Sequence, residues 1–392
     1  MDAICSFKAR LLIALSHTFL ALCLAGMIFL AGTQSARGQF TPDMGFITAA
    51  IKETIQGKEK HTGLFQEKAD TIRNANGKDV IHQKKIRTWI FYKAERIFYE
   101  YELVRFDPNV EAPESYWWGG YADLNGKLTA TVDSSEWFYS LLPEYYHPEA
   151  RYIITNASVS EGNKPEHLAI LDMDGQVVER IAPPVNPTFS VDRSVIAWVH
   201  KGHQEKQPAG LKLHYLNLDT RQEWEQGFPG TQPWVVLLDP EDHGVIYVQQ
   251  DTVYSVDPNN ILKWKSGMAS LKNGWLNSGD ARHFYHGSKG SYIQVFGREL
   301  KNHVSDRYLF SEICPQVLSS KAIEGSPYWY TISYVDTRTH LFRLFGPDLS
   351  LLGETMIKDG PTASVMAFFR PQDSIVKVYS DMKLIMEWKQ KP

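Results

Sequence analysis

The segment from 187 to 221 decides the fold. It reads PTFSVDRSVIAWV at 187–199 and, after a polar loop, LKLHYLNLDTR at 211–221. Short runs of β-branched and aromatic residues, separated by turns rich in Asp and Ser, are typical of strands in a small antiparallel sheet. The second run ends in the turn signal Asp219-Thr220-Arg221, and this signal has counterparts along most of the chain.

Seven turn signals recur, and most of them lie between two apolar, strand-like runs. They begin at Asp123, Asp172, Asp219, Asp257, Phe296, Phe345 and Asp381. The matching signals at 123 and 172, and those at 296 and 345, are related by an offset of 49 residues. Repeats of about 40–50 residues built from strands are typical of β-propellers, whose sheets cover one another's faces in a closed ring. The sequence therefore predicts an all-β fold, a seven-bladed β-propeller over 81–392, and leaves six or eight blades open.

The best repeat also carries a family resemblance. Its pattern, Phe-Ser-x-Asp followed by Ile-Ala-Trp-Val and by a strand ending in Leu-Asp-Thr, resembles the repeat of TolB-like propellers, which are relatives of the WD-repeat class. Degenerate copies occur at 146–154, 238–247 and 369–376. The chain departs from that family because the usual Pro-Asp-Gly turn is never intact and no separate N-terminal α/β domain is recognisable. The resemblance implies an architecture, and architecture does not fix a function.

The segment before the propeller, 39–80, is predicted to be a helix and a linker. Residues 41–57 have the pattern of one short helix, with Thr41 as N-cap and Gly57 as its end. Ile47, Ile51 and Ile55 place an apolar stripe on one face of it, which must pack on another element. Beyond the linker, 86–92 and 96–106 are predicted as two strands of the first blade.

The first 38 residues have the pattern of a signal peptide. Lys8 and Arg10 precede an apolar run at 11–30, and small residues at 36 and 38 predict cleavage before Gln39. The protein is therefore expected to be periplasmic or secreted. An uncleaved N-terminal anchor is the alternative, because about 20 apolar residues can span a bilayer. Beyond residue 38 the sequence holds one cysteine, Cys314, so no internal disulfide is expected.

Charge and motifs restrict the partners. The chain carries 41 basic and 45 acidic side chains, a formal net charge of −4, and it has no basic block, which argues against nucleic acid. The pairs His200/His203 and His283/His286 and the Asp172-x-Asp174 sequence resemble fragments of metal sites. A simpler interpretation is that the histidines are ordinary loop or strand residues. For Asp172, the simpler interpretation is a hairpin turn. No metal and no cofactor are predicted, and no catalytic residue is assigned.

Aromatic clusters supply the candidate ligand-facing residues. They are Trp117, Trp118, Tyr145, Tyr146 and Trp329. Aromatic side chains on a propeller face would suit a peptide or a sugar ring. The alternative is that these rings fill the core between neighbouring sheets.

The sequence favours a non-catalytic binding scaffold whose partner is a protein, a peptide or a glycan. Beyond the N-terminal segment, no membrane insertion is expected. The alternative is an enzyme acting on a polysaccharide, a lyase or hydrolase with its site in the propeller funnel. Two carboxylates about 5–10 Å apart beside an aromatic platform would favour that enzyme.

Export gives the first testable prediction. N-terminal sequencing of the periplasmic or secreted protein should begin at or near Gln39, because the peptidase reads the small residues just before it. Recovery of the full-length chain in the membrane fraction alone would contradict cleavage and support the anchor.

Overall fold

The structure is a computed structural model. It describes residues 41–390, except for 74–76, 111, 133–136, 142, 160–166, 182–184, 202–210, 229–234, 251, 268–273, 278, 282–283, 289–291, 297–301, 304–316, 349 and 359–364. The chain divides into two compact units, 1–46 and 47–392. Of the first unit only 41–46 are described, and they carry the start of the helix. The fold below is that of the second unit.

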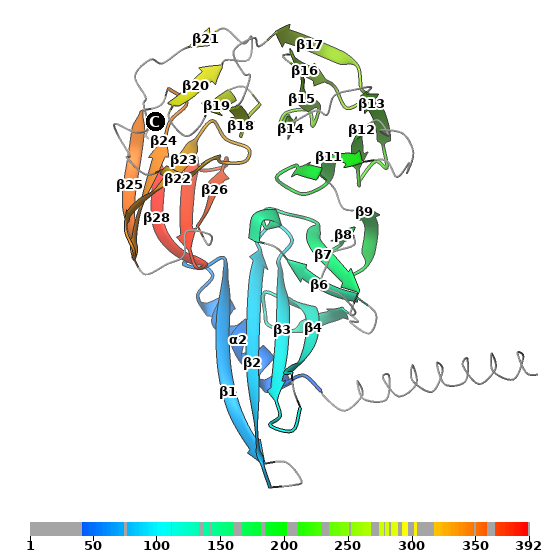
Figure 1. The fold of residues 1–392 in the computed structure, drawn as a ribbon, viewed down its shortest axis with the longest axis vertical. Helices are drawn as coiled ribbons and strands as arrows, with labels where there is room; N and C mark the ends of the chain where they lie inside the picture. Colours follow the sequence, from blue (N-terminus) through cyan, green and yellow to red (C-terminus); the bar gives the residue numbers. More distant parts are fainter. Residues whose placement is uncertain are drawn as a thin grey trace, which may run out of the picture. The chain divides into compact units, whose positions relative to one another are not determined.

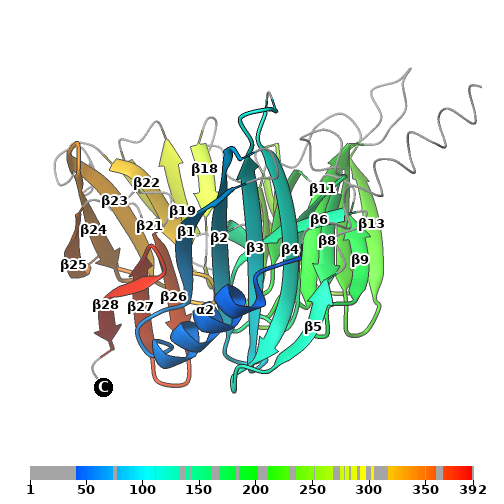
Figure 2. The same ribbon diagram turned by 90° about the horizontal axis from the view of Figure 1, so that it is seen from below.

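The predicted helix is present as α2, Met44–Gln56. Its N-cap is Asp43, whose Oδ1 accepts a hydrogen bond from the backbone N–H of Phe46 at 3.0 Å, so the N-cap predicted at Thr41 was two residues early. From Ile47 onward α2 lies against the first sheet (Figure 2), with Ile47 and Ile51 fully buried. The Oγ1 atoms of Thr54 and Thr88 are 2.7 Å apart across this contact.

The rest of the unit is built from antiparallel sheets whose strands follow chain order (Figure 1). The first sheet holds β1 (Gly63–Arg73), β2 (Asp79–Phe91), β3 (Arg96–Phe106), β4 (Glu114–Asp123) and β5 (Leu128–Val132). The second holds β6 (Trp137–Leu141), β7 (Ile153–Val159), β8 (His167–Leu171) and β9 (Val177–Ile181), and a short 3-10 turn, η1 (Pro143–Tyr145), follows β6. The third holds β10 (Val185–Phe189), β11 (Val195–Lys201), β12 (Leu211–Asn217) and β13 (Glu223–Phe228).

Four further sheets complete the described part of the chain. The fourth sheet holds β14 (Val235–Leu238), β15 (Val245–Gln249), β16 (Thr252–Val256) and β17 (Leu262–Gly267), and the fifth holds β18 (Gly274–Asn277), β19 (Phe284–Ser288), β20 (Tyr292–Phe296) and β21 (Asn302–His303). The sixth holds β22 (Val317–Ala322), β23 (Trp329–Asp336), β24 (Thr339–Phe345) and β25 (Leu351–Lys358). The seventh holds β26 (Met366–Arg370), β27 (Ile375–Ser380) and β28 (Lys383–Lys389). The all-β prediction is confirmed, as are the two strands expected at 86–92 and 96–106. How many of these sheets count as propeller blades stays a prediction.

The turn signals that begin at 123, 172, 219, 257, 345 and 381 occupy one structural position, the hairpin between the last two strands of a sheet, and most of the signal at 296–300 lies outside the described residues. At Asp172, Oδ1 accepts hydrogen bonds from the backbone N–H groups of Asp174 at 3.0 Å and Gln176 at 2.8 Å. Asp123 and Asp257 accept the equivalent pairs of bonds in their own hairpins. The turn also needs a residue with positive φ, supplied by Gly175 at 83°. In these hairpins the Asp carboxylate accepts the backbone N–H groups of the turn. This role explains why Asp begins most of the signals.

In the described part of the chain, apolar clusters join several sheets to their neighbours, including the last sheet to the first. One cluster contains Phe98 of the first sheet, Leu171 of the second, and Phe368 and Tyr379 of the last. Other clusters join the second sheet to the third, the third to the fourth, and the sixth to the seventh. His61, just before β1, forms a bridge with Lys383 at the start of β28. A closed ring of antiparallel sheets is the architecture of a β-propeller.

The turn chemistry can be tested at one hairpin. Asp172→Ala removes the acceptor of two backbone N–H groups and should lower the free energy of unfolding by about 1–2 kcal/mol. Asp174→Ala is the matched control and should cost much less, because the Asp174 backbone rather than its side chain serves the turn. Urea denaturation measures both. Equal losses in the two variants would contradict the assigned role.

Candidate functional site

The turns nearest the ring centre form a shallow cavity of about 270 Å³, called the mouth below. These inner turns connect β2–β3, β6–β7, β10–β11, β14–β15, β18–β19, β22–β23 and β26–β27. All seven sheets contribute to its wall, through Lys93, Glu149, Thr188, Phe189, Ser190, Val191, Asp192, Leu237, Leu238, Pro240, His243, Gly279, Glu324, Gly325, Pro371 and Gln372. The mouth is therefore a property of the closed ring, because no single sheet could form it.

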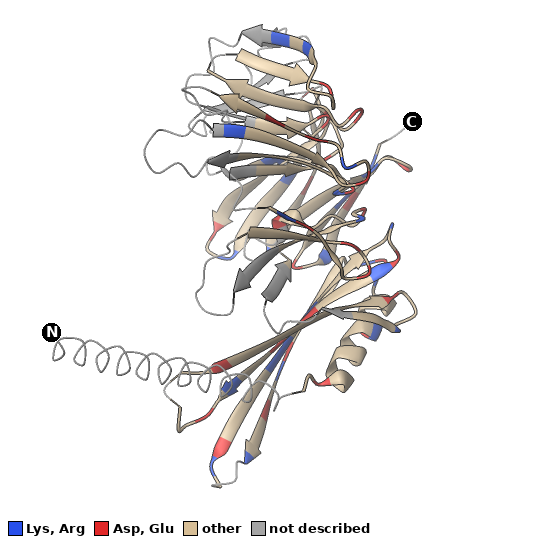
Figure 3. Ribbon diagram, turned by 90° about the vertical axis from the view of Figure 1, so that its right-hand side faces the viewer, with Lys and Arg blue, Asp and Glu red and all other residues tan. Residues whose placement is uncertain are grey.

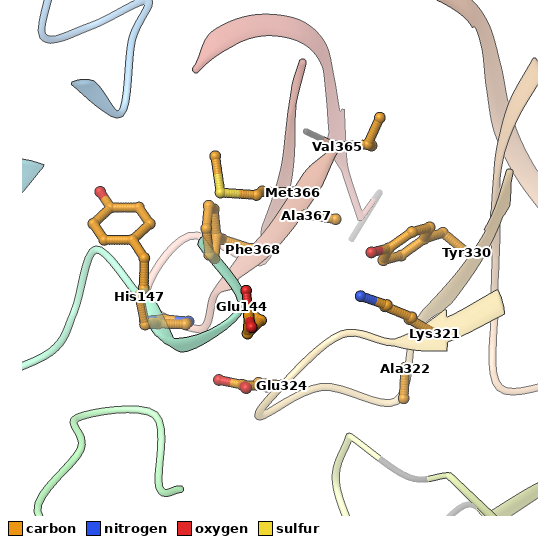
Figure 4. Close-up of a pocket in the computed structure, with 11 residues that line it drawn as sticks. Glu144, His147, Lys321, Ala322, Glu324, Tyr330, Val365, Met366, Ala367 and Phe368 are labelled. Atoms are coloured by element: carbon orange, nitrogen blue, oxygen red, sulfur yellow. The ribbon is translucent and has the colours of Figure 1, made fainter. Parts of the chain in front are cut away.

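A larger cavity of about 610 Å³, called the chamber below, is lined by the second, sixth and seventh sheets. Its polar groups come from Glu144 and His147 of the second sheet and from Lys321, Glu324 and Tyr330 of the sixth (Figure 4). Its apolar wall is formed by Ala322, Tyr146 and the run Val365, Met366, Ala367 and Phe368. Glu324 lines both the chamber and the mouth.

Arg193 holds the inner turns of three sheets together. Its side chain is 1% exposed, and it donates hydrogen bonds to the carbonyl oxygen of Tyr145 at 2.9 Å and to that of Ser190 at 2.8 Å. Its Nη1 also lies 2.8 Å from Oε2 of Glu324. The planar guanidinium has donors in a fixed fork, so it can serve three acceptors at once. Arg193 itself adopts a positive φ of 63° in the β10–β11 turn.

A second ionic network fixes the same turn. Arg151 donates to Asp192 at 2.8 Å and to Asp219 at 2.5 Å. Asp192 Oδ1 also accepts hydrogen bonds from the hydroxyls of Ser190 and Ser194. Burial opposes ionisation of Asp192, but the bonds from Arg151, Ser194 and Ser190 outweigh it and hold the pKa of its carboxyl well below the ordinary value. Asp192 is thus a structural carboxylate, already occupied by protein donors.

His147 carries a buried polar atom that has no hydrogen-bond partner among the described residues. Its ring is 1% exposed, and Nδ1 accepts a hydrogen bond from the backbone N–H of Glu149 at 3.2 Å. Burial, with a smaller contribution from the charge of Arg193, holds the pKa of His147 well below its usual value, so the ring is neutral. The proton then sits on Nε2, which has no hydrogen-bond partner among the described residues.

The aromatic residues singled out in the sequence do not gather at one place. Trp329 is buried and stacks on Phe345 with ring centroids 4.5 Å apart. Tyr146 is buried at the chamber wall, and its hydroxyl donates to the carbonyl oxygen of Ile90 at 2.5 Å, with the carbonyl oxygen of Thr62 at 3.2 Å. Tyr145, half-buried, packs edge-on against a phenylalanine of β10. These positions fit the alternative of core packing, and a ligand-binding role for these rings stays a prediction.

Trp117 and Trp118 lie on β4 of the first sheet, both half-buried. Trp118 packs against Tyr101 at 5.4 Å and Tyr116 at 6.4 Å between ring centroids. Neither tryptophan lines the mouth or the chamber. Because strand neighbours point to opposite faces, the adjacent pair cannot form a single flat platform.

The two histidine pairs considered as metal ligands lie outside the part whose side chains are described. Within the described residues, no group of three or more His, Cys, Asp or Glu side chains is placed to hold a metal ion. Asp172, the start of the calcium-like sequence, uses its Oδ1 for the hairpin turn. No helix in the described part is long and apolar enough to cross a membrane.

The residues that line the cavities were mostly missed by sequence reasoning. Glu144, Lys321 and Glu324 carry no motif, and the cavities bring them together from distant repeats. Two of the residues stood inside patterns that the sequence did reveal. Arg193 follows the Asp of the Phe-Ser-x-Asp turn, and His147 lies in the degenerate copy at 146–154. A basic residue inside a repeat turn was the available signal.

Comparison with known proteins identifies no family for this chain. No protein-family model matches the chain, and no curated protein sequence matches it. A structure described as the eukaryotic initiation factor has 10% identity and a TM-score of 0.40, covering 83% of this chain and 96% of that one. The Pan2 WD40 domain of Neurospora crassa has 8% identity and a TM-score of 0.37, covering 75% and 85%.

Prolyl oligopeptidase B from Galerina marginata, in its apo form, has 6% identity and a TM-score of 0.48, covering 85% of this chain. The match spans 49% of that longer chain. Identities this low carry no information about activity or ligand. The assignment of this chain to the β-propeller class therefore depends on its own ring of sheets.

The Asp192 network makes stability depend on pH. Its folded-state pKa is depressed, so its contribution is complete above the unfolded-state pKa of about 3.9 and is lost as the pH falls toward the folded value. Asp192→Asn should therefore be less stable than the wild type at pH 7, and the difference should shrink steadily below about pH 4. Thermal unfolding between pH 7 and 2.5 measures it. A difference that is independent of pH would contradict the network.

Proposed function

We propose that this protein is a non-catalytic binding scaffold, and that its partner is a segment of a protein or peptide seated at the mouth. The observation that carries the proposal is the composition of the mouth, to which inner turns of all seven sheets contribute. Turns held by a rigid ring can present different side chains to one ligand without changing the fold. The similarity of the repeat at 187–221 to TolB-like and WD-repeat propellers agrees with this proposal.

The chemistry of the mouth suits a polypeptide. Phe189, Leu237 and Leu238 supply apolar surface, while Lys93 and Glu149 supply opposite charges. Mixed apolar and polar surface of this kind is usual in protein interfaces. Basic and acidic residues are interspersed over the described strands and turns (Figure 3), which suits a protein better than a nucleic acid. A glycan partner has no comparable support, because the mouth has no stacked aromatic platform among its described residues.

An enzyme is the second candidate, and the observation in its favour is that Glu144 and Glu324 both line the chamber. The enzyme hypothesis is weakened because Glu324 is already paired with the buried guanidinium of Arg193. Asp192, another carboxylate near the centre, is held by donors of Arg151, Ser190 and Ser194. Glu324 and Asp192 thus serve to fix the turns.

Location outside the cytoplasm is part of the proposal and depends on the N-terminal sequence alone. The apolar run at 11–30 and the small residues before Gln39 support export with cleavage. A partner would then be a periplasmic or extracellular polypeptide. Retention by an uncleaved anchor would leave the mouth on the same side of the membrane.

Site-specific photocrosslinking tests the proposal. A photoreactive residue replaces Lys93 or Gln372 at the mouth, or, as matched controls, Thr220 or Asn259 in the outer hairpins. All four positions are in turns, so the substitutions should leave the fold intact. The same polypeptide should be crosslinked from both mouth positions and from neither control. Crosslinks from the outer hairpins alone, or none to any polypeptide, would contradict docking at the mouth.

The enzyme alternative has its own assay. Purified protein incubated with polysaccharides should release no new reducing or unsaturated ends. Release that is abolished by both Glu144→Gln and Glu324→Gln, in variants that remain folded, would replace the scaffold proposal with a glycoside-cleaving activity.

A further inference from the structure

The chamber contains two opposite charges that are not paired with each other. Glu144, from η1 after β6, and Lys321, from β22, both line this cavity. Figure 4 shows the two side chains extending into it from different elements. In the described part of the chain, neither forms a salt bridge, and Glu324 is the carboxylate that Arg193 occupies. An unpaired acid and an unpaired base facing one cavity are complementary to a ligand that carries both charges at separate ends.

The buried side chains around these charges also point to a ligand. His147 Nε2 is a buried donor without a described partner, and leaving such a group unsatisfied costs about 1–3 kcal/mol. Burial, with a smaller contribution from Glu324, raises the pKa of Tyr330, so its hydroxyl keeps its proton and can also donate. A ligand with hydrogen-bond acceptors between its charged ends would satisfy both donors. Peptide carbonyl groups are acceptors of this kind.

The remaining wall and the size of the cavity define the body of the ligand. Val365, Met366, Ala367 and Phe368 form an apolar strip along β26 and the residue before it. A cavity of 610 Å³ is about 10 Å across if it is round, and three residues of extended chain span about 10 Å. Apolar surface with a few placed polar groups is the usual composition of a small-molecule site.

From these observations we propose that the chamber binds a short apolar peptide with free termini, its ammonium group at Glu144 and its carboxylate at Lys321. His147 and Tyr330 donate to the peptide carbonyl groups, and the β26 strip packs against the side chains. The proposal concerns the chamber rather than the mouth, so it stands whether or not a larger partner docks at the inner turns.

Calorimetric titration with four forms of one peptide tests the proposal. The probes are trialanine, N-acetyl-trialanine, trialanine amide and the doubly blocked form. Trialanine should bind the wild-type protein, and blocking either terminus should weaken binding about three- to tenfold, because each block removes one charge-assisted contact. The doubly blocked form should bind most weakly.

Two variants assign each terminus to its residue. Glu144→Gln should abolish the effect of acetylation while keeping that of amidation, and Lys321→Met should do the reverse. Lys212→Met and Glu225→Gln are the controls, since that ion pair is exposed on β12 and β13 and should leave both effects intact. Selective loss of one effect cannot come from misfolding, because a misfolded protein would lose binding of every form.

Three results would overturn the proposal. They are the absence of binding of trialanine at millimolar concentration, equal affinity for all four forms, and an equal loss of affinity for all forms in either charge variant. A failure of photocrosslinking at the mouth would leave these titrations unaffected, so the two proposals can fail separately.

Discussion

The buried guanidinium of Arg193 is the contact on which the ring centre depends. It links the turn that follows β6, the β10–β11 turn and the β22–β23 turn through Tyr145, Ser190 and Glu324. A buried charge is costly unless its partners are complete, so these three turns are held in one arrangement. Glu324 lines both cavities, and Arg193 therefore also fixes the boundary between the mouth and the chamber.

The ring itself follows from the small size of the sheets. A sheet of four short strands cannot bury both of its faces alone, so each sheet must pack against its neighbours. The last sheet meets the first two through Phe368 and Tyr379, and Tyr146 is packed at the same place. The Tyr146 hydroxyl, from the second sheet, donates to the carbonyl oxygen of Ile90 in the first sheet, beside that of Thr62. The closing cluster is thus apolar, and this hydrogen bond adds a directional contact between the first and second sheets.

The sequence predicted those parts of the fold that are determined locally. The turn signals at Asp123, Asp172 and Asp257 form hairpins because a side-chain oxygen and a positive φ act within five residues. The strands β2 and β3 were predicted from their aromatic and β-branched residues. Strand β1 was not, because its sequence is polar and its structure depends on pairing with β2 from Gly63 opposite Trp89 onward. Local pattern cannot reveal a strand that is stabilised mainly by its partner.

The candidate site was much less accessible to sequence analysis. The chamber joins Glu144, Lys321 and Phe368, which lie far apart in the chain and share no spacing. Aromatic residues were visible, but whether a ring faces the core or a ligand depends on the strand register; Trp329, stacked on Phe345, is a core residue for this reason. Closure of the ring, and not any repeat by itself, generates the two cavities.

The stability of an Arg193 variant tests this account most directly. Arg193→Met keeps much of the side-chain volume but leaves two carbonyl oxygens and a carboxylate without their donor. In urea denaturation it should lose about 2–4 kcal/mol of unfolding free energy, because the carbonyl oxygens of Tyr145 and Ser190 lose their donor, whereas the half-exposed carboxylate of Glu324 can be solvated. Arg193→Lys should recover only part of this, since one ammonium cannot reproduce the fork. Arg73→Met, at a side chain that is 78% exposed, is the control. A loss at Arg193 no larger than that of the control would contradict the claim that this residue holds the ring centre together.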